Sequence, residues 1–392
     1  MKIVGVGAQN FRGAKILGIS NFQGLRLELF AVIGGLLFGF GFHTYIAFRV
    51  APLLLIIPFY LMWKRKQKKL IIIFCLFAFI AALPIGIYFL QNPQDFFGRS
   101  SQVSVFSAKS PLLAVGWNTI KTIGMFFVWG DSNWRHNLRG SPELWWPVAI
   151  LFLMGIWRAV KRAAARMKIE AIFLLLWFVV MLIPAVISNE SVPHSLRSIC
   201  AAPVAMIFAA LGLEWIIFKA ADWLHKKIGQ YPEKLRQLLR VKKELVILLF
   251  VFLIAVAGQN FNQYFFRWAN NPVVADAFDE SYTLFGKYLN TLPKNIPKYV
   301  IINTTATGIN DNPYEPPAIM FLTDTYVHAN RTKYNLFYVN PKDIAAFAEK
   351  ADRQENFYIT MLEFNPDINI FLRNKISGLK IDASSGIIVL YR

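Results

Sequence analysis

The sequence predicts a polytopic α-helical membrane protein of about seven spans, followed by a C-terminal extracytoplasmic α/β domain. Of the 392 residues, 56% are hydrophobic and only 17% are charged, whereas about a quarter of the residues in soluble domains are charged. Apolar stretches of spanning length recur up to about residue 262, and the composition then changes. We therefore expect a short N-terminal segment (1–26), a transmembrane domain (27–264) and a C-terminal domain (265–392).

Seven stretches approach the roughly 20 apolar residues that a spanning helix needs. They are 27–43, 46–63, 69–90, 144–160, 169–188, 197–218 and 244–262. The first two are short and nearly meet at HTYIAFR. We expect them to form a hairpin or a broken pair whose turn lies at the outer surface.

Basic clusters fix the direction of these spans. Five of the six residues in KRKQKK are basic, 158–168 holds five basic residues and no acid, and 219–243 holds eight basic residues and two acids. Because Lys and Arg collect in cytoplasmic loops, these alternate junctions face the cytoplasm with segment 1–26. Loops 91–143 and 189–196 then face outward, as does the C-terminal domain. The clusters also account for much of the net charge of +19, so no nucleic-acid partner is needed to explain it.

The outer loop 91–143 contains an apolar stretch at 110–130. An eighth span there would place the basic segment 158–168 outside, so we interpret the stretch as an interfacial helix on the outer leaflet. Neighbouring tryptophans fit an aromatic belt at that surface; they are Trp117, Trp129, Trp134, Trp145 and Trp146. The two cysteines, Cys75 and Cys200, lie in apolar stretches and offer neither a disulfide framework nor a CxxC metal site.

The C-terminal domain reads as alternating strands and helices, a pattern that favours a mainly parallel sheet. The expected strands are 298–305, 334–339, 355–362 and 386–392, and the expected helices are 274–289, 316–326 and 341–351. No GxGxxG follows the first strand, which argues against a dinucleotide site.

Two of the outer polar segments precede the fourth span. In HTYIAFR, Tyr45 and Arg49 are one helical turn apart, and Arg49 either contacts substrate or snorkels to the interface. In GDSNWRHNLRG, Asp131, Arg135, His136 and Asn137 are candidate substrate-binding residues. The alternative is that Asp131 pairs with Arg135 or caps a turn. Three ligands at metal spacing are not evident in this segment, so it predicts no metal site.

A third polar segment, PHSLRS, precedes the sixth span, and His194 and Arg197 share one helical face there. A helix N-terminus attracts anions and an arginine binds phosphate bidentately, so this segment is the most favourable phosphate site in the sequence. The alternative is interfacial anchoring. Segment 262–269, with Arg267, is more typical of an interface belt.

Three segments together resemble a known family. They are GGLLFGFGFHTYIAFRVAPL, GDSNWRHNLRGSPEL and PHSLRSICAAP, and they are similar to the C-terminal half of bacterial relatives of dolichyl-phosphate-mannose–protein mannosyltransferases. These are glycosyltransferases of the GT-C type, which are also similar to the aminoarabinose transferase of lipid A. The resemblance implies a protein of the plasma (inner) membrane that transfers sugar at the outer face.

The resemblance also implies a mechanism. A polyprenyl-phosphate-linked sugar is the donor, an acceptor hydroxyl of a protein, lipid or glycan attacks with inversion, and cations stabilise the departing phosphate. Arg135, His136, His194 and Arg197 are the implied phosphate or sugar contacts, with Tyr45 and Arg49 as weaker candidates. The resemblance implies no cofactor and leaves a divalent metal ion open.

One departure from the family concerns the catalytic base. The family places a carboxylate in its first outer loop, whereas no acid precedes Glu28 here, and Glu28 falls at the cytoplasmic end. The sequence therefore predicts a chain without the N-terminal catalytic part, and the catalytic residue stays unassigned. The alternative is a non-enzymatic membrane protein, such as a transporter, a flippase or an accessory subunit that handles lipid-linked glycans.

Overall fold

The computed structural model describes residues 17–166, 168–304, 316–383 and 386–392. Most of the predicted N-terminal segment 1–26 lies outside these residues. The chain divides into two compact units, Met1–Ala269 and Asn270–Arg392, so the division falls close to the predicted boundary at 264.

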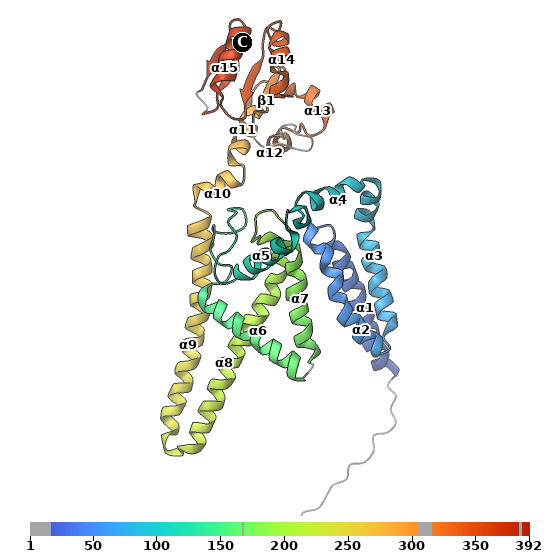
Figure 1. The fold of residues 1–392 in the computed structure, drawn as a ribbon, viewed down its shortest axis with the longest axis vertical. Coiled ribbons are helices and arrows are strands. Elements are labelled where there is room, and N and C mark those ends of the chain that lie inside the picture. Colours follow the sequence, from blue (N-terminus) through green and yellow to red (C-terminus); the bar gives the residue numbers. More distant parts are fainter. Residues whose placement is uncertain (1–16, 167, 305–315, 384–385) are drawn as a thin grey trace, which may run out of the picture. The chain divides into compact units, whose positions relative to one another are not determined.

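The first unit is helical (Figure 1). Its elements in chain order are α1 (Leu17–Gly41), η1 (Ile46–Leu55), α2 (Ile56–Lys64), α3 (Lys68–Gln91), α4 (Pro93–Gln102), η2 (Val105–Ser107), α5 (Pro111–Gly124), α6 (Trp146–Arg166), α7 (Ile169–Val186), η3 (Leu196–Ala201), α8 (Ala202–Gln230), η4 (Pro232–Lys234), α9 (Leu235–Phe261) and η5 (Asn262–Trp268). The η elements of this unit are 3₁₀ helices, except for η5, which is a π-helix.

Within the described residues, four helical segments are long and apolar enough to cross a membrane. They are Ile46–Lys64, Lys68–Gln91, Ile169–Val186 and Leu196–Gln230, and they match four of the predicted spans. These segments indicate an integral membrane protein. Helices α1, α6 and α9 also lie where spans were predicted, but they are not among these four, so their role as spans stays a prediction.

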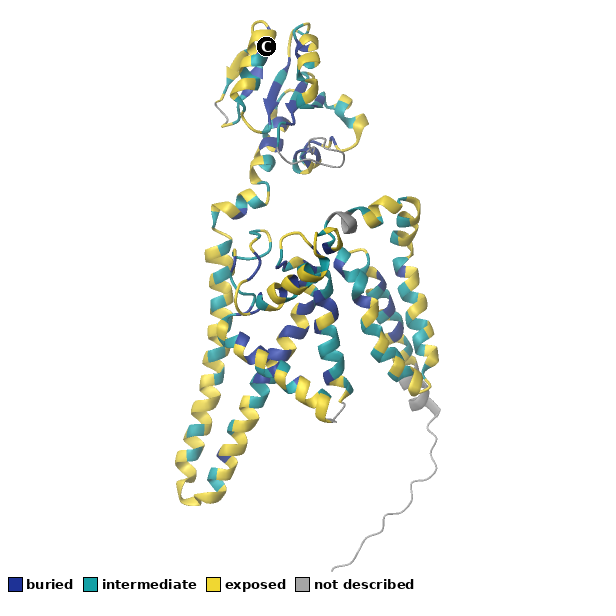
Figure 2. Ribbon diagram, in the orientation of Figure 1, coloured by how far each residue is buried: buried dark blue, intermediate teal, exposed yellow. Residues whose placement is uncertain are grey.

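The apolar surface of these helices suits a lipid environment. On α3, Ile72 is 66% exposed and Phe79 is 64% exposed, and no residue of α2 or α9 is buried. Figure 2 shows how much of these helices is exposed. Because exposing apolar area to water costs about 25 cal/mol per Å², such surfaces are stable where hydrocarbon covers them.

Glycines allow two pairs of helices to pack closely. A Cβ on Gly35 or Gly39 of α1 would lie 2.4 or 2.3 Å from a carbonyl oxygen of α3. Helices α6 and α8 cross (Figure 1), and there a Cβ on Gly155 would lie 1.8 Å from the Phe208 carbonyl oxygen and one on Gly212 would lie 2.0 Å from that of Leu151. Close backbone approach at small residues is how helices associate in membranes.

The connections at the two ends of the helices differ in composition. The α2–α3, α6–α7 and α8–α9 turns carry the basic clusters and lie at the same end in Figure 1. There Lys69 pairs with Glu28 of α1 at 2.6 Å. The long loops on either side of α5 and the loop before η3 lie at the other end. With 14 residues, α5 is about 21 Å long and too short to cross about 30 Å of hydrocarbon. Its position on the outer leaflet stays a prediction.

The second unit is an α/β domain. Its elements are α10 (Pro272–Ala277), α11 (Glu280–Thr291), β1 (Lys298–Ile301), α12 (Pro317–Leu322), α13 (His328–Lys333), β2 (Leu336–Val339), η7 (Pro341–Asp343), α14 (Ile344–Ala351), β3 (Tyr358–Met361), α15 (Pro366–Lys375), β4 (Lys380–Asp382) and β5 (Val389–Tyr391). The sheet order is β2-β1-β3-β5-β4.

The sheet of this domain is mixed. Strands β2, β1 and β3 are parallel, as expected, whereas β5 is antiparallel to both of its neighbours, β3 and β4. Alternate residues of a strand face opposite sides, so Val300 packs with α11 and α12 while Ile301 packs with α14 and α15. The single helix predicted at 274–289 is broken into α10 and α11, because Asp279 adopts a left-handed conformation with φ of 58°.

Candidate functional site

Asp131 joins two polar loops of the helical unit. The first loop runs from α5 to α6 and the second from α7 to η3. The Asp131 side chain is 1% exposed. Its Oδ1 accepts the Asn133 N–H at 2.8 Å and its Oδ2 accepts the Ser195 N–H at 2.8 Å. Because backbone donors on both loops converge on one carboxylate, the two polar segments of the sequence form one cluster.

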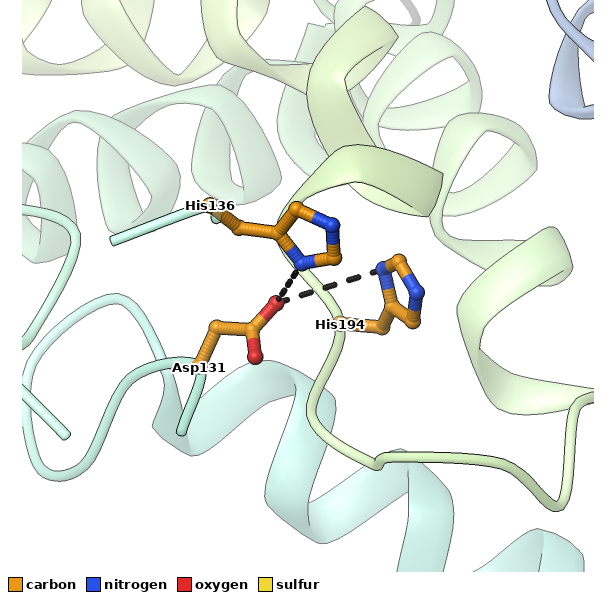
Figure 3. A group of neighbouring side chains, drawn as sticks. All are labelled: Asp131, His136 and His194. Atoms are coloured by element: carbon orange, nitrogen blue, oxygen red, sulfur yellow. Dashed lines mark hydrogen bonds and ion pairs between the residues drawn. The ribbon is translucent and has the colours of Figure 1, made fainter. Parts of the chain in front are cut away.

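Two histidines lie against the same carboxylate, as Figure 3 shows. His136 Nδ1 is 2.8 Å from Asp131 Oδ2, and His194 Nδ1 is 4.0 Å from the same oxygen. The two imidazole rings are 4.6 Å apart between centroids and are inclined by 34°. Sequence spacing alone does not bring these histidines together, because His194 belongs to the second loop.

Glu143 is a second carboxylate in the cluster that sequence reasoning missed. It accepts a hydrogen bond from Ser195 Oγ at 2.5 Å and one from Asn137 Nδ2 at 3.2 Å. Burial raises the pKa of Glu143, while the hydrogen bond from Ser195 acts to lower that pKa. The signal in the sequence was an isolated acid in GSPELWW, directly before a predicted span and in an outer loop with few acids.

His194 is held as a neutral imidazole. Burial, followed by the nearby charge of Arg197, lowers the pKa of His194 to about 4. Its Nδ1 accepts the Arg197 N–H at a long 3.3 Å. A neutral imidazole whose Nδ1 carries a lone pair can accept a hydrogen bond or bind a metal ion.

Arg197, the residue most favoured for phosphate, is buried in η3 and has partners in the loop that precedes η3. Its guanidinium donates to Ser188 Oγ, to the Glu190 carbonyl oxygen at 2.8 Å and to Glu190 Oε2 at 2.7 Å. The Glu190 side chain remains 44% exposed, whereas that of Arg197 is 8% exposed. A phosphate would have to displace Glu190 to reach this guanidinium.

The remaining polar residues of the first loop are either exposed to solvent or hydrogen-bonded within the loop. Arg135 is exposed, as is Arg139, which was not among the residues predicted from the sequence. Asn137 donates to the Ser141 carbonyl oxygen at 2.5 Å, so its amide holds the loop closed. Of the alternatives considered for Asp131, the pair with Arg135 is replaced by one with His136, whereas the turn cap is present as the bond from the Asn133 N–H.

Tyr45 and Arg49 lie at the start of η1. Arg49 Nη1 donates to the Phe96 carbonyl oxygen at 2.8 Å, and its guanidinium stacks 4.0 Å from the Phe96 ring centroid and 5.2 Å from that of Phe89. These contacts fix Arg49 against α3 and α4. Tyr45 precedes the first residue of η1 in an extended conformation and makes no side-chain cap there.

An apolar cavity of about 700 Å³ lies between α6, α8 and α9. Its walls are mostly aliphatic, with His225 and Lys242 among the few polar lining groups. The Asp131 cluster does not line it. Trp146 does line it, however, and follows Glu143 by three positions. The Cα atoms of these two residues are therefore at most about 11 Å apart. A hydrocarbon chain is the ligand class that such walls suit.

Fold and site define an integral membrane protein with a buried carboxylate–imidazole cluster at one end of its helices. Comparison with protein-family models, curated proteins and solved structures finds no match to this chain. The proposals below therefore start from the residues of the site and from the resemblance of the three sequence segments.

Proposed function

We propose that this protein is a membrane glycosyltransferase of the GT-C type. It binds a polyprenyl-phosphate-linked sugar at the outer face of the plasma membrane. The observation that carries the proposal is the joining of both polar loops by Asp131, which brings His136 and His194 together at one end of the helices. The exposed Arg135 and Arg139 belong to the same loop as His136. The apolar cavity, whose edge begins near Glu143, supports a ligand with a polar head and a hydrocarbon tail.

In the proposed reaction, an acceptor hydroxyl attacks the anomeric carbon of the donor with inversion. The bond from that carbon to the phosphate oxygen breaks, and polyprenyl phosphate leaves with the bond electrons. Exposed guanidinium groups stabilise the charge that develops on the phosphate, and we assign this role to Arg135 and Arg139. The base that takes the acceptor proton is not assigned to any residue of this chain.

Orientation is part of the proposal. Seven spans with the basic turns in the cytoplasm would put the Asp131 cluster and the C-terminal domain outside. In a Cys75→Ser/Cys200→Ser background, a Cys replacing exposed Ser132 should react with a membrane-impermeant maleimide on intact cells. A Cys replacing Arg65 should react only after the cells are opened. Labelling of the Arg65→Cys protein from outside would reverse the topology.

Binding of decaprenyl phosphate to the full chain in nanodiscs tests the function. We expect the phosphate form to bind more tightly than decaprenol, and the Arg135→Ala/Arg139→Ala double variant to weaken binding about 10-fold, because each exposed charged bond contributes modestly. Arg65→Ala, an exposed arginine in a basic turn, is the matched control. Equal binding of phosphate and alcohol would refute the proposed headgroup site.

The same preparation addresses the alternative of a transporter or flippase. In liposomes, a transferase should leave a fluorescent polyprenyl phosphate in the leaflet where it starts. Rapid movement of that lipid between leaflets, dependent on the protein, would favour the flippase and count against the transferase.

A further inference from the structure

We propose that Asp131, His136 and His194 form a binding site for one divalent transition-metal ion of the zinc class. The three side chains converge from two loops in Figure 3, and their ligand atoms all lie within 4.8 Å of one another. The proposal concerns metal binding by the chain alone, so it can succeed or fail independently of sugar transfer.

The distances are close to those of a metal site. Zinc binds nitrogen and carboxylate oxygen at about 2.0–2.2 Å in a tetrahedron, which places neighbouring ligand atoms about 3.3 Å apart. The separations from Asp131 Oδ2 are 2.8 Å to His136 Nδ1 and 4.0 Å to His194 Nδ1. One separation is shorter and the other longer than this value, and the ligand atoms of the two histidines lie within 4.8 Å of one another. Rotation of the two rings, with shifts of their nitrogens of up to about 1 Å, would place all three atoms around one ion.

The donor set indicates the class of ion. Two imidazole nitrogens and one carboxylate suit zinc, cobalt and related ions, whereas magnesium and calcium prefer oxygen ligands. The nearest competitor for the His194 lone pair is the Arg197 N–H, whose bond is long at 3.3 Å. A cation between His194 and Asp131 would replace that weak bond with a stronger one.

The surroundings hold the carboxylate in place for an ion. The backbone N–H groups of Asn133 and Ser195 fix both oxygens of Asp131, which is the kind of outer support that ligating carboxylates receive in metal proteins. With three protein ligands, a tetrahedral ion keeps one position for water or an anionic oxygen, as in catalytic rather than structural zinc sites.

Metal titration of the full chain, purified without a polyhistidine tag and stripped with a chelator, tests this site. We expect about one Zn²⁺ per chain by calorimetry, and visible absorption bands of tetrahedral Co²⁺ that Zn²⁺ abolishes. Mg²⁺ and Ca²⁺ should not compete. His194→Asn and His136→Asn should each weaken Zn²⁺ binding at least 100-fold, since losing even an outer support of a metal ligand costs roughly 10–100-fold.

His328→Asn, in the second unit, is the matched control and should leave Zn²⁺ binding unchanged. Melting curves in the presence of chelator show whether each variant is folded. If a variant does not fold, the cobalt spectrum of the unaltered chain still tests the site. The assignment would be overturned if the chain bound no Zn²⁺ or if Mg²⁺ competed with Zn²⁺. It would also be overturned if His194→Asn and His328→Asn lost Zn²⁺ affinity equally.

Discussion

Ser195 donates its backbone N–H to Asp131 Oδ2 at 2.8 Å across 64 positions of sequence. This bond holds the second polar loop against the first, while the His136 and Asn133 contacts fix the same carboxylate within the first loop. The site thus depends on one buried charge whose hydrogen bonds come from both loops.

Asp131→Asn should lower the free energy of unfolding by about 2–3 kcal/mol, because the amide loses the charge and turns a donor toward a backbone N–H or His136. Asp95→Asn, where an exposed carboxylate accepts from Tyr88, should change it by about 0.5 kcal/mol or less. Denaturant unfolding in detergent measures both. If the two substitutions changed the free energy of unfolding by similar amounts, Asp131 would not be the residue that joins the two polar loops.

Gly212→Ala should destabilise the helical unit by about 1–3 kcal/mol, since the new Cβ meets the Leu151 backbone oxygen at a helix crossing. Gly258→Ala on α9 is the control, because nothing lies within 4 Å of a Cβ there. We expect that control to be neutral or slightly stabilising. If Gly212→Ala unfolded at the same denaturant concentration as the control, the close crossing of α6 and α8 would be wrong.

Arg197 and Glu190 should be energetically coupled. In a double-mutant cycle with Arg197→Ala and Glu190→Ala, we expect a coupling energy of about 1–2 kcal/mol, reduced by the exposure of Glu190. Arg197→Ala alone should lower the free energy of unfolding more than Glu190→Ala does, since Arg197 also donates hydrogen bonds to the Ser188 hydroxyl and the Glu190 carbonyl oxygen. A coupling energy near zero would show that Arg197 is free to serve another ligand.

Asp352 should make the C-terminal domain sensitive to acid. Hydrogen bonds from the Ser377 N–H and hydroxyl, assisted by Arg392, lower the pKa of Asp352 below its ordinary value. A carboxyl whose pKa is lower in the folded state stabilises the fold above the unfolded pKa, and this stability is lost as the pH falls through the folded pKa. The stability gained from Asp352 should therefore be complete at pH 5 and disappear well below pH 4.

Hydrogen exchange of the full chain measures this effect at the peptide that holds β5. Asp352→Asn should exchange faster than the unaltered chain at pH 5, and the difference should vanish at strongly acidic pH. Comparing the two proteins at each pH cancels the intrinsic pH dependence of exchange. If the two proteins still differed in exchange rate at the lowest pH, the effect would not come from ionisation of Asp352.

Hydropathy and charge predicted the elements whose formation depends on local sequence. The spans expected at 46–63, 69–90, 169–188 and 197–218 correspond to the four described membrane-length segments, because length and apolarity suffice to define them. All four expected strands were found in shortened form, although 305 lies outside the described residues. Strand β4 and helices α13 and α15 were missed, since they are short and carry many polar residues.

The contacts within the site could not be predicted from spacing. Within GDSNWRHNLRG the natural partners of Asp131 were its near neighbours, and the segment alone lacked a third metal ligand. His194 and Ser195 supply the missing contacts only because α7 and η3 bring the second loop to the end of α5. The pairing of Arg197 with Glu190 could have been predicted, because only seven positions separate the two residues in one polar segment of the sequence.

The most direct test of the account is hydrogen exchange of the full chain with decaprenyl phosphate, compared with decaprenol. If the joined loops bind the lipid phosphate, peptides covering 131–140 and 188–198 should both gain protection with the phosphate and neither with the alcohol. Protection confined to the basic turns at 64–69 and 219–243, or no protection at all, would contradict a lipid-phosphate site at the Asp131 cluster.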